Sequence, residues 1–385
     1  MSLLLFRRWT TGKSGTALAV VAHTLSIVLP AQAELAAQMT SIDTSATKLF
    51  VSPQGSPSAS ASSPFNERPL GLADGQPGTV VTSSTTSALP SNVSVAGKDD
   101  STIGRGTSVG LVLGMYAGLH VLAYLAWYAD APRDRFQWSS DGWFGPSTYA
   151  GGSDKVGHFF MTHFLTRANA GVLESGGWHP RSSTYAGVML TLGAYYVIEM
   201  QDGFTFGFSK NDMIANIAGA ATGVLFREVP TLDKMFDTRV EYIPSSNYLR
   251  RIKKDGFNFN EDYNGLTFLL AWHLCSVPWL EQNGGVLRFM DLVLGYNTLN
   301  YKPKPAEPHP TRYQDRFIGI SLNLQRVVDE LWTSNRHPRF GASASRMHGL
   351  VHFATEFFNI PYTSLRLGTW RTEYHGHTSV QFYDP

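Results

Sequence analysis

The stretch from Asp154 to Gly223 decides the fold. It begins DKVGHFFMTH at 154–163, its second segment closes with EMQDG at 199–203, and its third opens with SKNDMIANIAG at 209–219. These segments are mainly apolar but carry acidic or imidazole groups near their ends. Burying such groups costs several kcal/mol each unless they are paired, hydrogen-bonded or metal-bound. We therefore expect packed helices whose polar ends meet.

Helical spacing explains how these polar side chains could converge. Asp154 and His158 are four residues apart and share one helix face, as do Asp212 and Asn216. Antiparallel packing places the end of one helix beside the start of the next. The sequence therefore predicts a candidate catalytic cluster whose members are Asp154, Lys155, His158, Glu199, Asp202, Asp212 and Asn216.

The donor types in this region also suit a divalent metal, which is the one cofactor that the sequence suggests. The spacing of the first two histidines is His-x4-His, not the His-x3-His of a one-face zinc helix. Ser209 precedes Asp212 by three residues, so Asp212 could instead serve only to cap its helix. The candidate metal ligands are His158, His163, Glu199, Asp202 and Asp212.

The first part of the chain has the composition of an export signal followed by a linker. Basic residues precede an apolar run and a small-x-small site, which predicts a signal peptide over 1–33, cleaved after Ala33. Residues 34–104 are rich in Ser, Thr, Pro and Gly and are predicted to form a disordered tether. We expect an exported protein in the periplasm or envelope membrane of a bacterium.

Residues 105–236 are predicted to form a helical domain. The run from Gly106 to Tyr128 has no Asp, Glu, Lys or Arg and is long enough to span a bilayer. Its glycines recur every fourth residue, which would let another helix approach closely. The same pattern suits a buried helix of a soluble bundle. We favour membrane association of a four-helix core, and the sequence leaves spanning open.

Residues 237–385 change to the two-residue period of strands. Five strands are too few to close a membrane barrel, so we expect a small antiparallel sheet and an α+β fold overall. Helices are expected at 325–332 and 343–358. The predicted strands are 238–243, 265–274, 290–301, 317–324 and 378–383.

The net charge of +1, without a large basic cluster, gives no support to nucleic-acid binding. A membrane lipid or an envelope protein is the expected partner. The oligomeric state does not follow from the sequence. The lone Cys275 cannot form an internal disulfide.

The ordered motifs resemble those of the YfiM-type family of bacterial envelope proteins (domain of unknown function 2279) and, more loosely, VanZ-like membrane proteins. The motifs are DKxxH at 154–158, ExxDG at 199–203 and SxxDxxxNxxG at 209–219. The resemblance implies an envelope location and a compact helical core, and it implies no established reaction. Lipoprotein members carry a lipobox cysteine, which is lacking here.

Three functions fit these observations. The polar cluster could be a satisfied network that locks the helices together, in a structural or assembly-related protein. It could instead serve a metal-assisted hydrolase or transferase that acts on a lipid-linked or cell-wall substrate. The third hypothesis is a binding or assembly module that uses the sheet.

Overall fold

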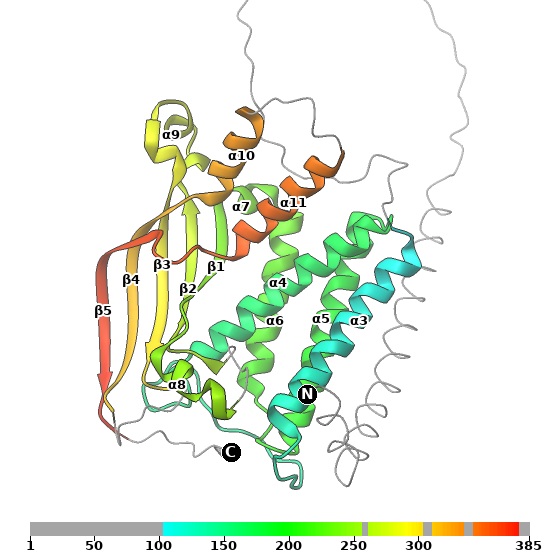
Figure 1. Cartoon of the computed structure of the whole chain (residues 1–385), viewed down its shortest axis with the longest axis vertical. Helices are drawn as coiled ribbons and strands as arrows, with labels where there is room; N and C mark the ends of the chain where they lie inside the picture. The colour runs from blue at the N-terminus through cyan, green and yellow to red at the C-terminus, as the bar shows by residue number, and fades with distance from the viewer. Residues whose placement is uncertain (1–102, 256–260, 303–309, 335–341, 377–385) are drawn as a thin grey trace, which may run out of the picture.

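The computed structural model describes residues 103–255, 261–302, 310–334 and 342–376. Long helices lie on one side of the molecule and a sheet on the other (Figure 1). The mixed α+β class is therefore confirmed. The predicted signal peptide, nearly all of the predicted tether and the predicted strand 378–383 lie outside the described residues.

The helical part is organised around α4. This helix packs against α5 and α6, and α3 lies against it as well. Local signals set the starts: Pro180 occupies the first turn of α5, and Ser209 caps α6 by accepting a hydrogen bond from the backbone N–H of Asp212 at 3.0 Å. The bounds are α3 Arg105–Ala123, α4 Ser153–Ser175, α5 Pro180–Gly203 and α6 Lys210–Glu228.

Glycine allows α4 and α6 to approach closely. A Cβ at Gly219 would clash with the backbone carbonyl of Phe159 and the hydroxyl of Thr162. A larger residue at this position would therefore force the two helices apart. The sequence predicted a close helix contact on α3, whereas the structure has one here, at Gly219.

The glycine stripe of α3 was expected to receive another helix, and this prediction is wrong for the described part of the chain. A Cβ on Gly106, Gly110, Gly114 or Gly118 would meet no described atom within 4 Å. The opposite face of α3 packs on the other helices, so the stripe points outward. Beyond α3, the chain continues in a π-helical turn, Tyr124–Tyr128.

The sheet is a five-stranded antiparallel meander in the order β1-β2-β3-β4-β5. Four predicted strands correspond to β1 to β4, although β4 starts five residues before the expected Phe317. The last strand, β5, was not predicted. The bounds are β1 Phe236–Tyr242, β2 Leu266–His273, β3 Met290–Leu299, β4 Arg312–Leu322 and β5 Ser364–Tyr374.

Two further helices, α10 (Leu324–Ser334) and α11 (Ala342–Phe357), confirm the helices expected near the end of the chain. They pack against each other, and α11 also contacts β1. Figure 1 shows both near the upper end of the sheet. Shorter helices were not expected, namely α7 Pro230–Met235, α8 Ser246–Asp255 and α9 Pro278–Asn283.

The helical part and the sheet share an apolar core. Phe160 of α4 packs with Val240 of β1, Phe268 of β2 and Phe357 of α11. Farther along the face that carries Phe268, the cross-strand pair Leu270 and Leu294 is exposed. The opposite face of β1 to β4 is largely buried, and there polar side chains such as Asp237 and Arg239 accompany an apolar group that includes Leu269 and Val293.

Candidate functional site

The end of α5 and the beginnings of α4 and α6 lie at one level of the helical part. The polar side chains gathered there, together with a loop aspartate, form what we call the helix-end cluster. Its members come from α4, α5, α6 and the loops preceding α4 and α6. They are Asp141, Asp154, Lys155, His158, Glu199, Ser209, Asp212 and Asn216.

Lys155 is the centre of what we call the inner half of this cluster, which it forms with Asp141, Asp154 and Asp212. Its ammonium group contacts Asp154 at 2.8 Å, Asp212 at 2.7 Å and also Asp141. Burial by itself would lower the pKa of Lys155, but the three surrounding carboxylates raise it above its ordinary value. Lys155 is therefore a permanent buried cation that joins the loop at 141 to α4 and α6.

Sequence reasoning missed Asp141. It lies in an irregular loop, where no helical period connects it with the other members. Its Oδ2 also accepts a hydrogen bond from the hydroxyl of Ser209 at 3.0 Å. The one local signal is the pair Asp141-Gly142, which is typical of a turn, and Gly142 has a positive φ of 75°.

His158 lies in what we call the outer half of the cluster, with Glu199 and Asn216 beside it and Asp212 between the two halves. Its Nδ1 lies 3.0 Å from Oδ1 of Asn216 and 3.9 Å from Oε1 of Glu199, and its Nε2 lies 3.8 Å from Oδ1 of Asp212. Donation from Nδ1–H to the Asn216 carbonyl oxygen leaves the lone pair of a neutral imidazole on Nε2. That nitrogen can accept a proton or bind a metal.

Asp202 and His163 lie apart from these contacts. Asp202 is at the rim, where its carboxylate accepts a hydrogen bond from the hydroxyl of Tyr128 at 2.7 Å. His163 is buried elsewhere, with Nδ1 2.8 Å from the hydroxyl of Thr238 on β1. It is five residues from His158, so the two rings project from different sides of α4. The structure therefore places His163 outside the helix-end cluster.

The electrostatics favour proton binding by the carboxyl groups. Burial raises the pKa of Glu199 to about 8, and the Asp212 carboxylate adds to the effect although His158 opposes it. Burial also raises the pKa of Asp202 to about 7. The pKa of Asp212 is lowered, because His158 and Lys155 outweigh its own burial. These carboxyl groups are therefore driven toward different charge states.

Several polar atoms of the cluster are buried without a hydrogen bond from the described residues. They include Oε1 of Glu199, Oδ1 of Asp212 and Nδ2 of Asn216. Oδ1 of Asp212 nevertheless lies within ion-pair distance of Lys155, so only its hydrogen-bond geometry is poor. One donor atom each from His158, Glu199 and Asp212 lies within 4.8 Å of the others. These three residues could hold a divalent cation.

A partly open apolar hollow of about 190 Å³ lies beside the cluster. Lys155 forms part of its wall, and the other lining residues come from α4, α6 and the loop after Asp141. Apart from Lys155, the lining of this hollow is apolar. The other lining residues are Trp143, Phe144, Val156, Phe159, Ile214, Ala215 and Ala218.

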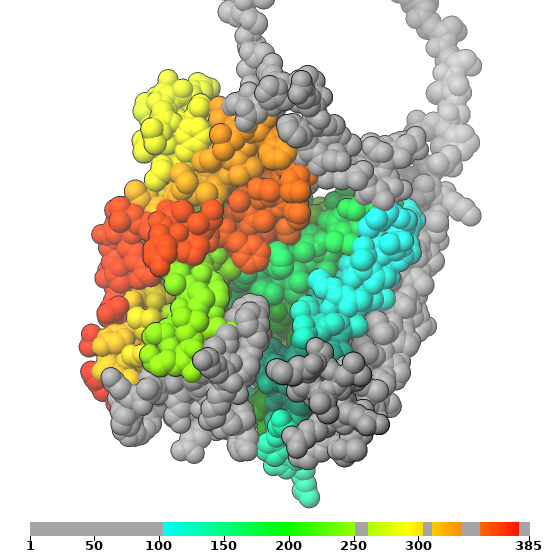
Figure 2. All heavy atoms as spheres, in the orientation of Figure 1, coloured from blue at the N-terminus to red at the C-terminus, as the bar shows by residue number. Residues whose placement is uncertain are grey.

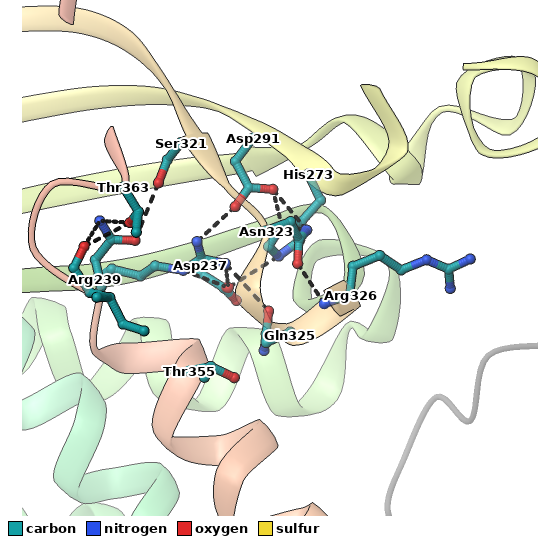
Figure 3. Close-up of polar contacts among 12 residues, drawn as sticks. Asp237, Arg239, His273, Asp291, Ser321, Asn323, Gln325, Arg326, Thr355 and Thr363 are labelled. Atoms are coloured by element: carbon teal, nitrogen blue, oxygen red, sulfur yellow. Dashed lines mark hydrogen bonds and ion pairs between the residues drawn. The ribbon is translucent and has the colours of Figure 1, made fainter. Parts of the chain in front are cut away.

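A second buried polar group, the sheet cluster, lies at one end of the sheet (Figure 3). Arg239 pairs with Asp237 at 2.6 Å and with Asp291 at 2.7 Å, and His273 contacts the same two carboxylates at 3.2 and 2.8 Å. Asn323 donates to Asp291 at 2.8 Å. Two cations thus face two carboxylates, so this cluster is balanced in charge.

The sheet cluster was not predicted from the sequence. The available signal was Asp237, Arg239 and Glu241 at alternate positions of β1, which places three charges on one face of a strand. Burial would lower the pKa of His273, but Asp237 and Asp291 raise it to about 10. The full pairing of this group indicates a role in holding the sheet together.

Among the comparisons with known proteins, the one match covers residues in the helical part of the chain. Neither a curated protein nor a solved structure matches the chain. One family model matches residues 140–228, and its description is predicted periplasmic lipoprotein (DUF2279). That range contains the whole helix-end cluster, and its description fits an exported envelope protein. Over residues 140–228, the chain is thus similar to the DUF2279 family of predicted periplasmic lipoproteins.

Proposed function

We propose that this is a membrane-associated envelope protein whose helix-end cluster is a cation-dependent acid–base centre, of hydrolase or transferase type, for a lipid-linked substrate. The observation that carries the proposal is the imbalance of charge in the cluster and at its rim. Five carboxyl groups meet two basic side chains there; the five are Asp141, Asp154, Glu199, Asp202 and Asp212.

A surplus of buried carboxylates must be neutralised. Protons can do this, as the raised pKa values of Glu199 and Asp202 indicate, and so can a divalent cation. His158, Glu199 and Asp212 offer one nitrogen and two carboxylate oxygens, a donor set that suits Mn²⁺ or Zn²⁺. Asn216 would orient the imidazole of His158 by accepting a hydrogen bond from its Nδ1–H.

The residues of the chain supply the other parts of such a centre. Glu199, with a pKa near neutrality, can take up or release a proton. Lys155 holds Asp154 and Asp212 in place without occupying the outer half of the cluster. The apolar hollow beside Lys155 favours a substrate with a hydrocarbon chain. A bound cation would supply Lewis-acid activation of the scissile group.

The outer face of α3 supports association with a membrane. Among the described helices, only Arg105–Tyr128 is long and apolar enough to cross a bilayer, and 22% of its most apolar window is buried. Figure 2 shows α3 on the surface of the helical part. The exposed apolar side chains of α3 are Leu111, Met115, Leu119 and Leu122, and Leu125 of the following π-helical turn is exposed as well. A bilayer is the partner that would cover this face.

A structural network is the second candidate, and the complete pairing of Lys155 favours it. The variant Asp212→Asn separates the two functions, because Asp212 contacts both Lys155 and His158. Lys155 and His158 favour the ionised form of Asp212, so the neutral amide should lower the free energy of unfolding under either function. In a cation centre the variant should also lose cation binding, whereas in a purely structural network a loss of roughly 1–3 kcal/mol in unfolding free energy is the whole effect.

The test measures Mn²⁺ binding by electron paramagnetic resonance and unfolding by urea, with the exposed Asp130→Asn as control. Mn²⁺ that binds the wild type and is lost in the folded Asp212→Asn variant supports the centre. Wild-type protein that binds no Mn²⁺, together with a destabilised variant, would refute it. The reaction class is tested by mass spectrometry of an envelope lipid extract incubated with the wild type or with Glu199→Gln.

A further inference from the structure

Two histidines of α11 lie on one face of that helix. The segment His348-Gly-Leu-Val-His352 has the His-x3-His spacing that the residues after Asp154 lack. Residues four apart in a helix are neighbours on its surface, so both imidazoles project toward the same side. Two imidazoles in this arrangement are a common half of a zinc site.

The facing helix supplies the third donor. Asp329 of α10 places its Oδ1 2.7 Å from Nε2 of His348 and 3.1 Å from Nδ1 of His352. One donor atom from each of these three residues lies within 4.8 Å of the others. Since α10 and α11 pack against each other, their backbones already hold the donors together.

From this geometry we propose that Asp329, His348 and His352 form a mononuclear zinc site that joins α10 to α11. Zinc binds nitrogen and carboxylate donors at about 2.0–2.2 Å, so neighbouring donors of a tetrahedron lie about 3.3–3.6 Å apart. The two nitrogen–oxygen distances, 2.7 and 3.1 Å, are shorter than this by about 0.2–0.9 Å, because a hydrogen bond now joins the atoms. Small rotations of the side chains would admit the ion.

The surroundings fit a metal that is reached from solvent. The side chains of His348, His352 and Asp329 are 23, 35 and 19% exposed, so an ion can enter and water can complete its coordination. The indole of Trp332 stacks on the ring of His348, with centroids 5.2 Å apart and an angle of 25°. This contact restricts the orientation of the imidazole, as outer-shell partners of metal ligands do.

Donor chemistry favours zinc over magnesium or calcium. Two imidazoles and one carboxylate suit Zn²⁺, whereas Mg²⁺ and Ca²⁺ prefer oxygen donors. The site is separate from the helix-end cluster, with which it shares no residue. Three protein ligands leave one tetrahedral position for water or another small ligand. The ion would tie together two helices at the end of the sheet.

The experiment uses the full chain, without a histidine tag and treated with a chelator. Zn²⁺ binding is measured by equilibrium dialysis, and Co²⁺ serves as a spectroscopic probe because tetrahedral Co²⁺ absorbs strongly in the visible range. We expect His348→Ala, His352→Ala and Asp329→Asn each to weaken this site by more than about 100-fold, since even outer-shell losses cost about 10- to 100-fold.

Two controls make the result specific. His179→Ala removes an exposed histidine elsewhere, and Asp130→Asn neutralises an exposed carboxylate, so both should retain the Co²⁺ band. Circular dichroism of the metal-free variants checks that they are folded. A wild-type protein without a tetrahedral Co²⁺ band would overturn the site, whatever the stability of the variants. Unchanged Zn²⁺ binding in folded His348→Ala and His352→Ala would do the same.

Discussion

The carboxyl group of Glu199 links the helix-end cluster to pH. Its pKa is about 8 in the folded chain, against an ordinary value of 4.5, because its side chain is buried. The folded state therefore binds this proton more tightly than the unfolded state does. The resulting stabilisation is full below pH 4.5 and is lost as the pH rises through about 8.

Glu199→Gln should remove this dependence, because an amide stays neutral. In the presence of a chelator, we expect the variant to match the wild type near pH 4.5. Above that pH it should become more stable than the wild type, by up to roughly 1.4 kcal/mol per pH unit until about pH 8. Urea unfolding at several pH values measures the gap. A gap that is constant with pH would contradict the burial of an ionisable Glu199.

The carboxylate of Asp291 is central to the charge pairing of the sheet cluster. It pairs with Arg239 and with His273, and all three side chains are buried. Asp291→Ala would leave buried cations without their partner, so we expect a loss of about 3–5 kcal/mol in unfolding free energy. Glu281→Ala, which breaks a more exposed pair with Arg326, should cost only about 0–1 kcal/mol. Similar denaturation midpoints for the two variants would count against the pairing described.

Contact between helices α4 and α6 depends on glycine. Gly219→Ala places a methyl group against the carbonyl oxygen of Phe159, so we expect a loss of roughly 1–3 kcal/mol from the displaced helices. Gly171→Ala on α4 is the matched control, because its Cβ would meet no described atom. That variant should be stabilised by up to about 1 kcal/mol through helix propensity. Thermal unfolding that moves both variants in one direction would refute this account.

The exposed apolar face of α3 is the surface by which the whole molecule is proposed to associate with a membrane. Replacing the exposed Leu111, Leu119 and Leu122 of α3 by serine should abolish co-sedimentation with phosphatidylethanolamine–phosphatidylglycerol vesicles, because about 1.5–3 kcal/mol of transfer free energy is lost per side chain. Folding should be little affected. The same change at the exposed Leu287 and Leu331 should leave vesicle binding intact. Equal binding by both variants would place the membrane contact elsewhere.

The sequence predicted more of the helices and strands than of their contacts. Repeats of 3.6 and two residues arise within a segment, so the long helices and β1 to β4 were visible in it. The strand β5 was missed even though Leu365 and Leu367 alternate with arginine and glycine. Its side chains are largely exposed, so little burial pattern marks it.

Spacing along the helices determined which polar residues of the site share a face, including Asp154 with His158 and Asp212 with Asn216. This information is local, because side-chain direction follows the backbone of a single helix. Only the tertiary structure decided that Asp141 joins Lys155, that His163 turns toward β1, and that α10 brings an aspartate to the histidines of α11. Such pairings depend on how separate elements pack, and packing is set by the burial of whole surfaces and not by the spacing of residues within one segment.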